Sequence, residues 1–278
     1  MNGWLNWREI EKNNDWGVRS RSDATAELWN ENADQWEERS KSETDFSRRQ
    51  VESLDISPED TVLDVCCGTG PLTVWLARRA KRVVALDYGR DMLAHVKRKA
   101  EEQGLKNIET VQGNWYSMTP GVDFPKCDVA VTRHSPAQGD ILKFSRCAEK
   151  RCYSLWNCAE PYSSGRQETV SRFIKSEDRD KNVGVRPNGR LYGFNVHFNL
   201  LYDMGANPTV NYVENVSEIA AATEQELMEK VMAGRPYLRE DEDRIRERII
   251  SLENGALAYR RVCRISVLGW DPGEIRDI

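Results

Sequence analysis

Short apolar runs alternate with longer amphipathic segments through the middle of the chain. The apolar runs have the length and composition of buried strands and occupy residues 61–65, 82–87, 108–112, 127–132 and 151–157. The intervening segments have apolar residues at helical spacing and occupy residues 71–80, 91–103 and 138–149. Because strands that alternate with helices usually form a parallel sheet covered on both faces, this pattern predicts a doubly wound α/β fold.

The two flanking regions have different patterns. Residues 1–60 are polar and hold five of the nine tryptophans, with Trp29, Ala33 and Trp36 at roughly helical spacing. Beyond residue 190 the pattern predicts a buried helix over 191–204 and a strand over 209–213. Two charged helices are expected within 217–252, and a closing strand over 257–268. We therefore expect an N-terminal helical lid segment over 1–60 and one α/β domain over 61–278. The lid and a helical insertion near 217–252 would form a cap, and the last strand would be antiparallel.

The length and charge of the chain narrow the classes of function. A chain of 278 residues fits one large domain or one domain with an insertion. Forty basic and forty-five acidic residues give a net charge of −5, whereas a nucleic-acid binder is usually basic or carries a basic stripe. No apolar run approaches the roughly 20 residues that span a membrane, and the first residues lack a signal-peptide core. We expect a cytoplasmic protein without membrane contact, and the charge disfavours nucleic acid while leaving RNA open.

The cysteines predict neither disulfides nor a metal site. There are seven, an odd number at irregular spacing, which indicates a reducing compartment. Cys147, Cys152 and Cys158 follow one another closely, but they lack the tight pairs that zinc sites usually have. We expect them to be small buried residues and predict no metal ion.

Residues 62–70 read Val-Leu-Asp-Val-Cys-Cys-Gly-Thr-Gly, an apolar run followed by a tight glycine turn. Backbone that approaches a ligand closely needs small side chains, which Gly68, Gly70 and Cys66 provide. A dinucleotide site would have three glycines at a longer spacing. The acidic side chain of Asp64 would oppose a phosphate, so the turn favours a cationic or amine-bearing ligand.

Two further strand ends complete the pattern of a nucleoside site. Asp87 ends the second strand, where a carboxylate can accept hydrogen bonds from both hydroxyls of a ribose. Gln112, Gly113, Asn114 and Trp115 follow the third strand, and an amide beside an indole suits the edge and face of adenine. The expected ligand is a nucleoside with a positively charged, amino-acid-like tail and no phosphate.

Because of these residues, the stretch 61–135 resembles the class I S-adenosylmethionine-dependent methyltransferases. It is most similar to the small-molecule branch that includes ubiquinone and menaquinone C-methyltransferases. The resemblance implies that Asp64–Gly70 holds the methionine moiety, Asp87 the ribose and Asn114 the adenine amino group, while Met92 packs against the adenine. It also implies that S-adenosylhomocysteine is the product.

The sequence departs mildly from the family pattern. Cys66 replaces a glycine, and Asn114 replaces the more usual aspartate. The segment from Trp29 to Trp36 resembles the N-terminal part that closes over the cofactor in these enzymes. The complete set of expected cofactor contacts is Asp64, Cys66, Gly68, Gly70, Asp87, Tyr88, Met92, Gly113, Asn114, Trp115 and Arg133.

The fourth strand should end beside the transferred methyl group, because ligands in this fold lie at the carboxyl ends of strands. His134 follows that strand and is the expected catalytic base, with an ordinary loop histidine as the alternative. Arg133 could instead hold a carboxylate or phosphate of the substrate, or form a structural ion pair. The residues expected to contact the substrate are Trp29, Trp36, Tyr162, Asn195, His197 and Tyr202, although the tryptophans could simply dock helices and His197 could be buried and satisfied.

Missing motifs favour a small acceptor. The sequence after the fourth strand is Thr-Arg-His-Ser-Pro, not the Asn/Asp-Pro-Pro-Tyr element of amino-group DNA and protein-glutamine methyltransferases. No paired glutamates mark an arginine methyltransferase. We predict methyl transfer to a small molecule. Methylation of RNA or protein is the alternative, a non-catalytic cofactor-binding protein is the second, and the oligomeric state stays open.

Overall fold

The chain forms two compact units. In this computed structural model, unit 1 comprises Met1–Asn157, Tyr192–Val213 and Ile265–Ile278, and unit 2 comprises Cys158–Leu191 and Glu214–Arg264. The residues that the structure describes are 6–12, 25–41, 43–158, 194–232 and 239–276. Among them, no helix combines the length and the apolar character that a bilayer crossing requires.

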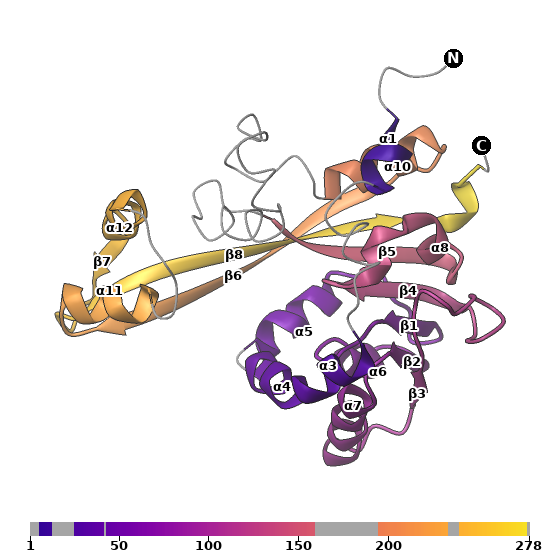
Figure 1. Ribbon diagram of the computed structural model, residues 1–278, viewed down its shortest axis with the longest axis horizontal. Coiled ribbons are helices and arrows are strands. Elements are labelled where there is room, and N and C mark those ends of the chain that lie inside the picture. Colours follow the sequence, from indigo (N-terminus) through magenta and orange to yellow (C-terminus); the bar gives the residue numbers. More distant parts are fainter. Residues whose placement is uncertain (1–5, 13–24, 42, 159–193, 233–238, 277–278) are drawn as a thin grey trace. The chain divides into compact units, whose positions relative to one another are not determined.

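Unit 1 is built on the parallel sheet that the apolar runs predict. Its five central strands are β1 (Thr61–Val65), β2 (Arg82–Asp87), β3 (Ile108–Gln112), β4 (Cys127–Arg133) and β5 (Ala148–Cys158). Neighbouring strands pair in parallel from β3 through β2, β1 and β4 to β5 (Figure 1). Beyond β5 the order continues with β8 (Leu257–Trp270) and β6 (Thr209–Ala221), which run in opposite directions. The predicted doubly wound, Rossmann-like α/β fold with an antiparallel last strand is therefore confirmed.

The helices between the strands differ in length from the sequence pattern. They are α6 (Thr73–Ala77), α7 (Arg90–Glu102), the 3-10 turn Pro136–Gly139, α8 (Ile141–Ser145) and α10 (Phe194–Asp203). The single helix expected over 138–149 is wrong. Asp140 starts a new helix there by accepting a hydrogen bond from the Lys143 amide at 2.9 Å, and β5 already begins at Ala148.

The N-terminal segment contributes four described helices to unit 1: α1 (Trp7–Lys12), α3 (Ala26–Glu31), α4 (Ala33–Lys41) and α5 (Thr44–Glu52). The hydropathy pattern did not predict α5. Asn30 of α3 accepts a hydrogen bond from the Asp91 amide at 3.0 Å, at the start of α7. The buried Glu37 of α4 pairs with Lys99 of α7 at 2.6 Å. These contacts join the N-terminal helices to the α/β core, and their role as a lid stays a prediction.

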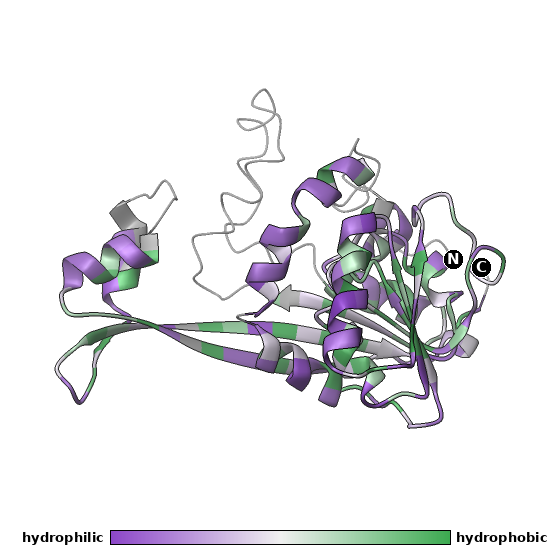
Figure 2. Cartoon of the chain, turned by 90° about the horizontal axis from the view of Figure 1, so that it is seen from below, coloured by the Kyte–Doolittle hydropathy of each residue, from purple (hydrophilic) through white to green (hydrophobic). Residues whose placement is uncertain are grey.

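The hydrophobic core lies along the parallel strands. Figure 2 shows apolar residues concentrated on the strands of unit 1, whereas the helices carry long hydrophilic sections. Strand residues such as Leu63, Leu86 and Ala130 have no exposed surface. Trp270 of β8 packs against Phe144 of α8 with ring centroids 5.8 Å apart. This buried sheet positions the residues that follow its strands.

The last two long strands, β6 and β8, each run from one unit into the other. Residues of β6 and β8 belong to both units, and α11 (Glu224–Met232), α12 (Arg239–Arg246) and β7 (Ile249–Ser251) lie between them in sequence. The helical prediction for 217–252 is wrong at its start, because β6 extends to Ala221. Ion pairs between Glu218 and Arg260 and between Glu214 and Arg264 join the two strands along this extension. The charged residues of this region therefore lie on strands as well as on helices.

Candidate functional site

Three strand ends meet at the carboxyl edge of the sheet in unit 1. Val65 of β1 pairs with Leu86 of β2 on one side and with Thr132 of β4 on the other. The residues that follow these positions therefore lie at one level of the sheet. They include most of the side chains that the sequence pattern assigns to a cofactor.

Asp64 is a buried carboxyl group on β1. Its side chain is almost fully enclosed and accepts a hydrogen bond from the Thr73 hydroxyl at 2.6 Å. Burial raises the pKa of Asp64 to about 6, while the Thr73 hydrogen bond and the charge of Arg133 act in the opposite direction. The carboxyl group therefore titrates just below neutral pH, and a cationic ligand beside it would favour the ionised form.

The turn after β1 has a backbone conformation that favours glycine at three positions. Cys66, Gly68 and Gly70 all adopt left-handed conformations, with φ of 55°, 56° and 80°. At Gly70 an added Cβ would lie 2.8 Å from Cγ2 of Val96, so a side chain does not fit there. Cys66 accepts a conformation that costs a non-glycine residue of order 1–2 kcal/mol, as expected where the family pattern has glycine. Burial also raises the pKa of its thiol.

Asp87 connects the turn to the second strand. Its Oδ2 accepts a hydrogen bond from the Gly68 amide at 2.8 Å, and its Oδ1 accepts one from the Gly89 amide at 2.9 Å. Burial raises the pKa of Asp87, and these backbone hydrogen bonds oppose the rise. Tyr88 is half-buried beside it, and Met92 is buried on α7. The Asp87 carboxylate thus contacts the glycine turn, while the contacts of Asp87 and Met92 with a cofactor stay predictions.

The loop after β3 reaches the same edge. The Gly113 amide donates to the carbonyl oxygen of Asp87 at 2.9 Å, and Oδ1 of Asn114 accepts from the Tyr116 amide at 3.0 Å. Trp115 is only 3% exposed and packs against Phe124 in the core. Its indole ring therefore has a structural role in this conformation, and its contact with adenine stays a prediction.

The end of β4 carries the predicted catalytic residue. His134 is exposed and has a left-handed φ of 49°, uncommon for a residue with a side chain. Just before it, the guanidinium of Arg133 donates from Nη1 to Gln50 Oε1 at 2.9 Å and to Ser47 Oγ at 3.2 Å. Both partners belong to α5, which no motif indicated. The sequence analysis missed them because only the fold brings α5 beside β4.

The predicted substrate residues fall into two groups. Trp29 and Trp36, on α3 and α4, lie with ring centroids 6.5 Å apart, and Trp36 is 43% exposed. Asn195, His197 and Tyr202 lie on α10. Tyr162 lies outside the described residues. The structure thus groups the predicted residues by element, and their contact with a substrate stays a prediction.

Within α10, His197 and Tyr202 have opposite environments. His197 has no exposed surface, and its Nε2 lies 3.1 Å from Oε1 of Glu11 on α1. Tyr202 is exposed and its ring stacks on Phe198. His197 is therefore buried, as the alternative expected, but neither ring nitrogen makes a hydrogen bond within the described part of the chain, so it is not satisfied in this conformation. The neighbouring carboxylate of Glu11 was not singled out by the sequence pattern.

The cysteine cluster has the packing of core residues. Cys147 and Cys152 are fully buried, and Cys158 is half-buried. The thiol of Cys152 faces the carbonyl oxygen of Phe144 at 3.9 Å, a weak sulfur contact. In the described part of the chain, no three His, Cys, Asp or Glu side chains are grouped as metal ligands would be.

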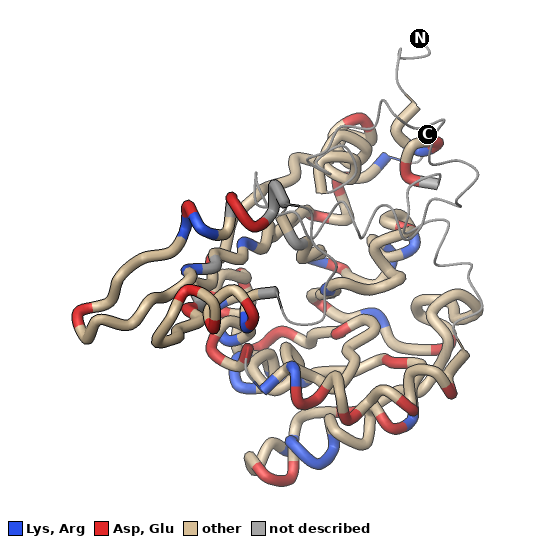
Figure 3. The backbone as a smooth tube through the Cα atoms, turned by 60° about the vertical axis from the view of Figure 1, so that its left-hand side comes forward, with Lys and Arg blue, Asp and Glu red and all other residues tan. Residues whose placement is uncertain are grey.

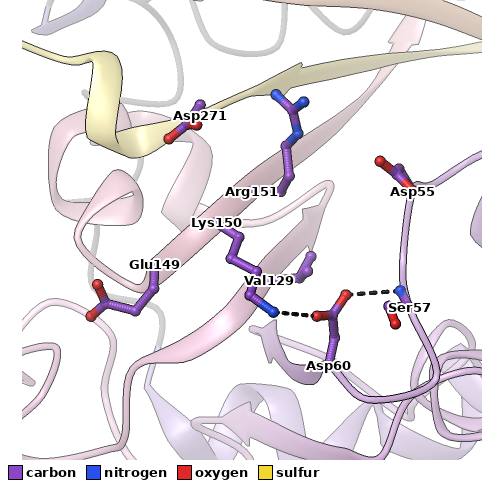
Figure 4. A pocket seen from close by; sticks show the side chains of 8 residues that line it. All are labelled: Asp55, Ser57, Asp60, Val129, Glu149, Lys150, Arg151 and Asp271. Atoms are coloured by element: carbon purple, nitrogen blue, oxygen red, sulfur yellow. Dashed lines mark hydrogen bonds and ion pairs between the residues drawn. The ribbon is translucent and has the colours of Figure 1, made fainter.

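A separate polar pocket of about 480 Å³ lies at the amino ends of the strands. It is lined by Asp55, Ser57, Asp60, Val129, Glu149, Lys150, Arg151 and Asp271 (Figure 4). Lys150 donates to Asp60 at 2.8 Å, and Asp60 also accepts from the Ser57 amide. Because ligands of doubly wound sheets bind at the carboxyl ends, this pocket is not the candidate cofactor site.

Comparisons with known proteins include a family model that matches the part of the chain forming β1 to α8. Residues 62–143 match the sequence model of a family described as "Methyltransferase domain". An uncharacterized protein of Haemophilus influenzae is 26% identical over 179 residues, 62% of this chain and 60% of that protein. A demethylmenaquinone methyltransferase of Bacillus cereus is 36% identical over 72 residues, 25% of this chain and 30% of the relative. A 23S rRNA (uracil(1939)-C(5))-methyltransferase of Photobacterium angustum is 44% identical over 61 residues, 22% of this chain and 28% of the relative.

The matched region contains the glycine turn, Asp87 and the end of β4. With the strand order of the sheet, the match identifies a class I S-adenosylmethionine-dependent methyltransferase domain. The chain spans between 28% and 60% of the length of the three relatives, and the two that carry an enzyme name match it over 72 and 61 residues.

The raised pKa of Asp64 predicts a pH dependence of stability. The folded state binds this proton more tightly than the unfolded chain, whose value is near 3.8, so the stabilisation is complete below that pH and is lost as the pH rises through about 6. Asp64→Asn removes the titration. From about pH 4.5 to pH 7, the free energy of unfolding of the unsubstituted protein should therefore fall by about 2 kcal/mol more than that of Asp64→Asn.

Urea unfolding at both pH values measures this difference. Asp123→Asn, at an exposed carboxylate outside the site, is the control and should follow the unsubstituted protein. If Asp64→Asn follows it as well, the carboxyl of Asp64 is not titrating in this range.

Proposed function

We propose that this protein binds S-adenosylmethionine at the carboxyl ends of β1, β2 and β4 and transfers its methyl group to a small molecule. The observation that carries the proposal is a pair of buried carboxyl groups, Asp64 and Asp87, on adjacent strands beside the glycine turn. Both lie in the region that matches the methyltransferase domain. A negatively charged turn suits a nucleoside that carries a sulfonium and no phosphate.

Asp87 is suited to hold the ribose. A carboxylate offers about four acceptor positions, and the Gly68 and Gly89 amides occupy two of them. The remaining positions could accept the two ribose hydroxyls. S-adenosylmethionine supplies a methyl group on a positively charged sulfur, and the ionised form of Asp64 would favour that charge nearby.

The remaining task of the protein is alignment of the acceptor. Methyl transfer is an in-line displacement, so the chain mainly orients the two reactants and excludes water. A base is required only when the acceptor must lose a proton, and exposed His134 at the end of β4 is our candidate. Its left-handed backbone is the kind of conformation that often occurs at functional sites.

Charge and similarity together support a small acceptor in the cytoplasm. Figure 3 shows acidic and basic residues interspersed along the described chain, and the net charge is −5. A demethylmenaquinone methyltransferase acts on a small molecule, and it matches over 72 residues. The rRNA methyltransferase match makes RNA the alternative acceptor, and it covers 61 residues. A non-catalytic binding protein is the other alternative.

Calorimetry with S-adenosylmethionine and S-adenosylhomocysteine tests the donor. Both should bind, and Asp87→Asn should weaken S-adenosylhomocysteine by about 1.5–3 kcal/mol because a charged acceptor of the ribose hydroxyls is lost. Glu101→Gln, the same chemical change at an exposed site on α7, should bind as the unsubstituted protein does. The assignment fails if neither nucleoside binds, and the role of Asp87 fails if its variant binds with unchanged affinity.

Transfer of a labelled methyl group tests the acceptor. The protein is incubated with methyl-labelled S-adenosylmethionine and, separately, with the small-molecule, RNA and protein fractions of a cell extract. Label should accumulate in the small-molecule fraction, because acidic and basic residues are interspersed along the described chain and the net charge is −5, whereas nucleic-acid binders are usually basic. Label in RNA or protein would establish the alternative acceptor, and no transfer with intact cofactor binding would favour the non-catalytic alternative.

The role of His134 can be measured in the same transfer assay. His134→Ala should slow transfer by about 100-fold or more if the imidazole removes a proton from the acceptor. Its affinity for S-adenosylhomocysteine should be unchanged, because His134 is not among the predicted cofactor contacts. An unchanged transfer rate would remove His134 as a base.

A further inference from the structure

Gln50 is a fully buried amide at the candidate site that no sequence motif indicates. It lies on α5, and its Oε1 accepts a hydrogen bond from Arg133 Nη1 at 2.9 Å. Ser47, one turn earlier and also fully buried, accepts from the same nitrogen at 3.2 Å. Gln50 therefore lies directly beside the end of β4.

The amide nitrogen of Gln50 has no hydrogen-bond partner among the described residues. Its orientation is set by chemistry, because a guanidinium can only donate and Oε1 must therefore face Arg133. Nε2 consequently directs two N–H donors elsewhere. Buried donors are almost always paired, so this nitrogen indicates an acceptor that the chain itself does not supply.

The charges around Gln50 indicate what kind of acceptor this is. The guanidinium of Arg133 is half-buried and permanently charged. It acts on Asp64, where burial raises the carboxyl pKa and the charge of Arg133 opposes the rise. A cation and a neutral amide donor side by side suit an anionic oxygen, and a planar carboxylate matches a guanidinium well.

We propose that Gln50 Nε2 and the guanidinium of Arg133 form a binding subsite for the carboxylate of a ligand. The inference rests on the proposed function, because it places this subsite beside the cofactor turn. The carboxylate could belong to the methionine part of the donor or to the acceptor. In either case α5 contributes directly to ligand binding as well as covering the sheet.

Gln50→Glu separates a binding role from a structural one. Glutamate has nearly the same shape as glutamine and still accepts a hydrogen bond from Arg133. If the role of Gln50 is only to hold Arg133, the glutamate variant should therefore hold it as well or better. It lacks the two amide donors and repels an anion. The unfolding midpoint should therefore stay the same or rise, while affinity for the carboxylate falls. Gln35→Glu, at an exposed position on α4, is the matched control.

Two nucleosides and one simple anion distinguish the sources of the carboxylate. Calorimetry compares S-adenosylhomocysteine with 5′-methylthioadenosine, which lacks the amino-acid part. Saturation-transfer NMR then measures benzoate binding to the protein saturated with S-adenosylhomocysteine. If the donor supplies the carboxylate, Gln50→Glu weakens S-adenosylhomocysteine on the order of 10-fold or more and leaves 5′-methylthioadenosine unchanged.

If the acceptor supplies the carboxylate, both nucleosides bind Gln50→Glu normally and benzoate binding is lost. The subsite is contradicted if Gln50→Glu changes neither nucleoside affinity nor benzoate binding, because a buried water would then satisfy Nε2. It is also contradicted if Gln50→Glu weakens the binding of both nucleosides equally. Failure of the unsubstituted protein to bind either nucleoside would contradict the proposed function instead. In that case benzoate binding to the free protein tests the subsite by itself. Loss of benzoate binding in Gln50→Glu would support the subsite, and unchanged benzoate binding would contradict it.

Discussion

The hydrogen bonds of the Asp87 carboxylate hold the candidate site together. One oxygen accepts from Gly68 in the turn after β1, and the other accepts from Gly89 at the start of α7. The backbone carbonyl of the same residue accepts from Gly113 in the loop after β3. Three loops therefore meet at one buried acid, and the turn can approach a ligand only with a negative charge beside it. That constraint is the physical reason to expect a cationic nucleoside in place of a phosphate.

Local pattern was enough to predict the centre of the fold. The five parallel strands were predicted because each contains a short apolar run, and only β3, at the edge of the sheet, is partly exposed along its length. The turn was predicted because backbone that approaches a ligand closely needs small side chains, and Cys66 has the same left-handed conformation as Gly68 and Gly70. Asp87 was recognisable because it ends the second strand, where a carboxylate can accept hydrogen bonds from a ribose.

The contacts that depend on distant parts of the chain could not be predicted. Gln50 lies 83 positions before Arg133, and α5 has too few apolar residues to stand out as a helix. Trp115 resembles a ligand contact in sequence, but Phe124 packs against its ring in the core. His197 pairs with Glu11 across more than 180 residues of sequence. In each case the partner is set by the tertiary fold, and no local pattern encodes it.

A crystal structure with bound S-adenosylhomocysteine would test the central claim most directly. Our account predicts adenosine at the carboxyl ends of β1 and β2, with both ribose hydroxyls within hydrogen-bond distance of the Asp87 carboxylate. It also predicts that the Gly68 and Gly89 amides keep their contacts with that group. A nucleoside bound elsewhere, for example in the polar pocket beside Lys150, would contradict the account.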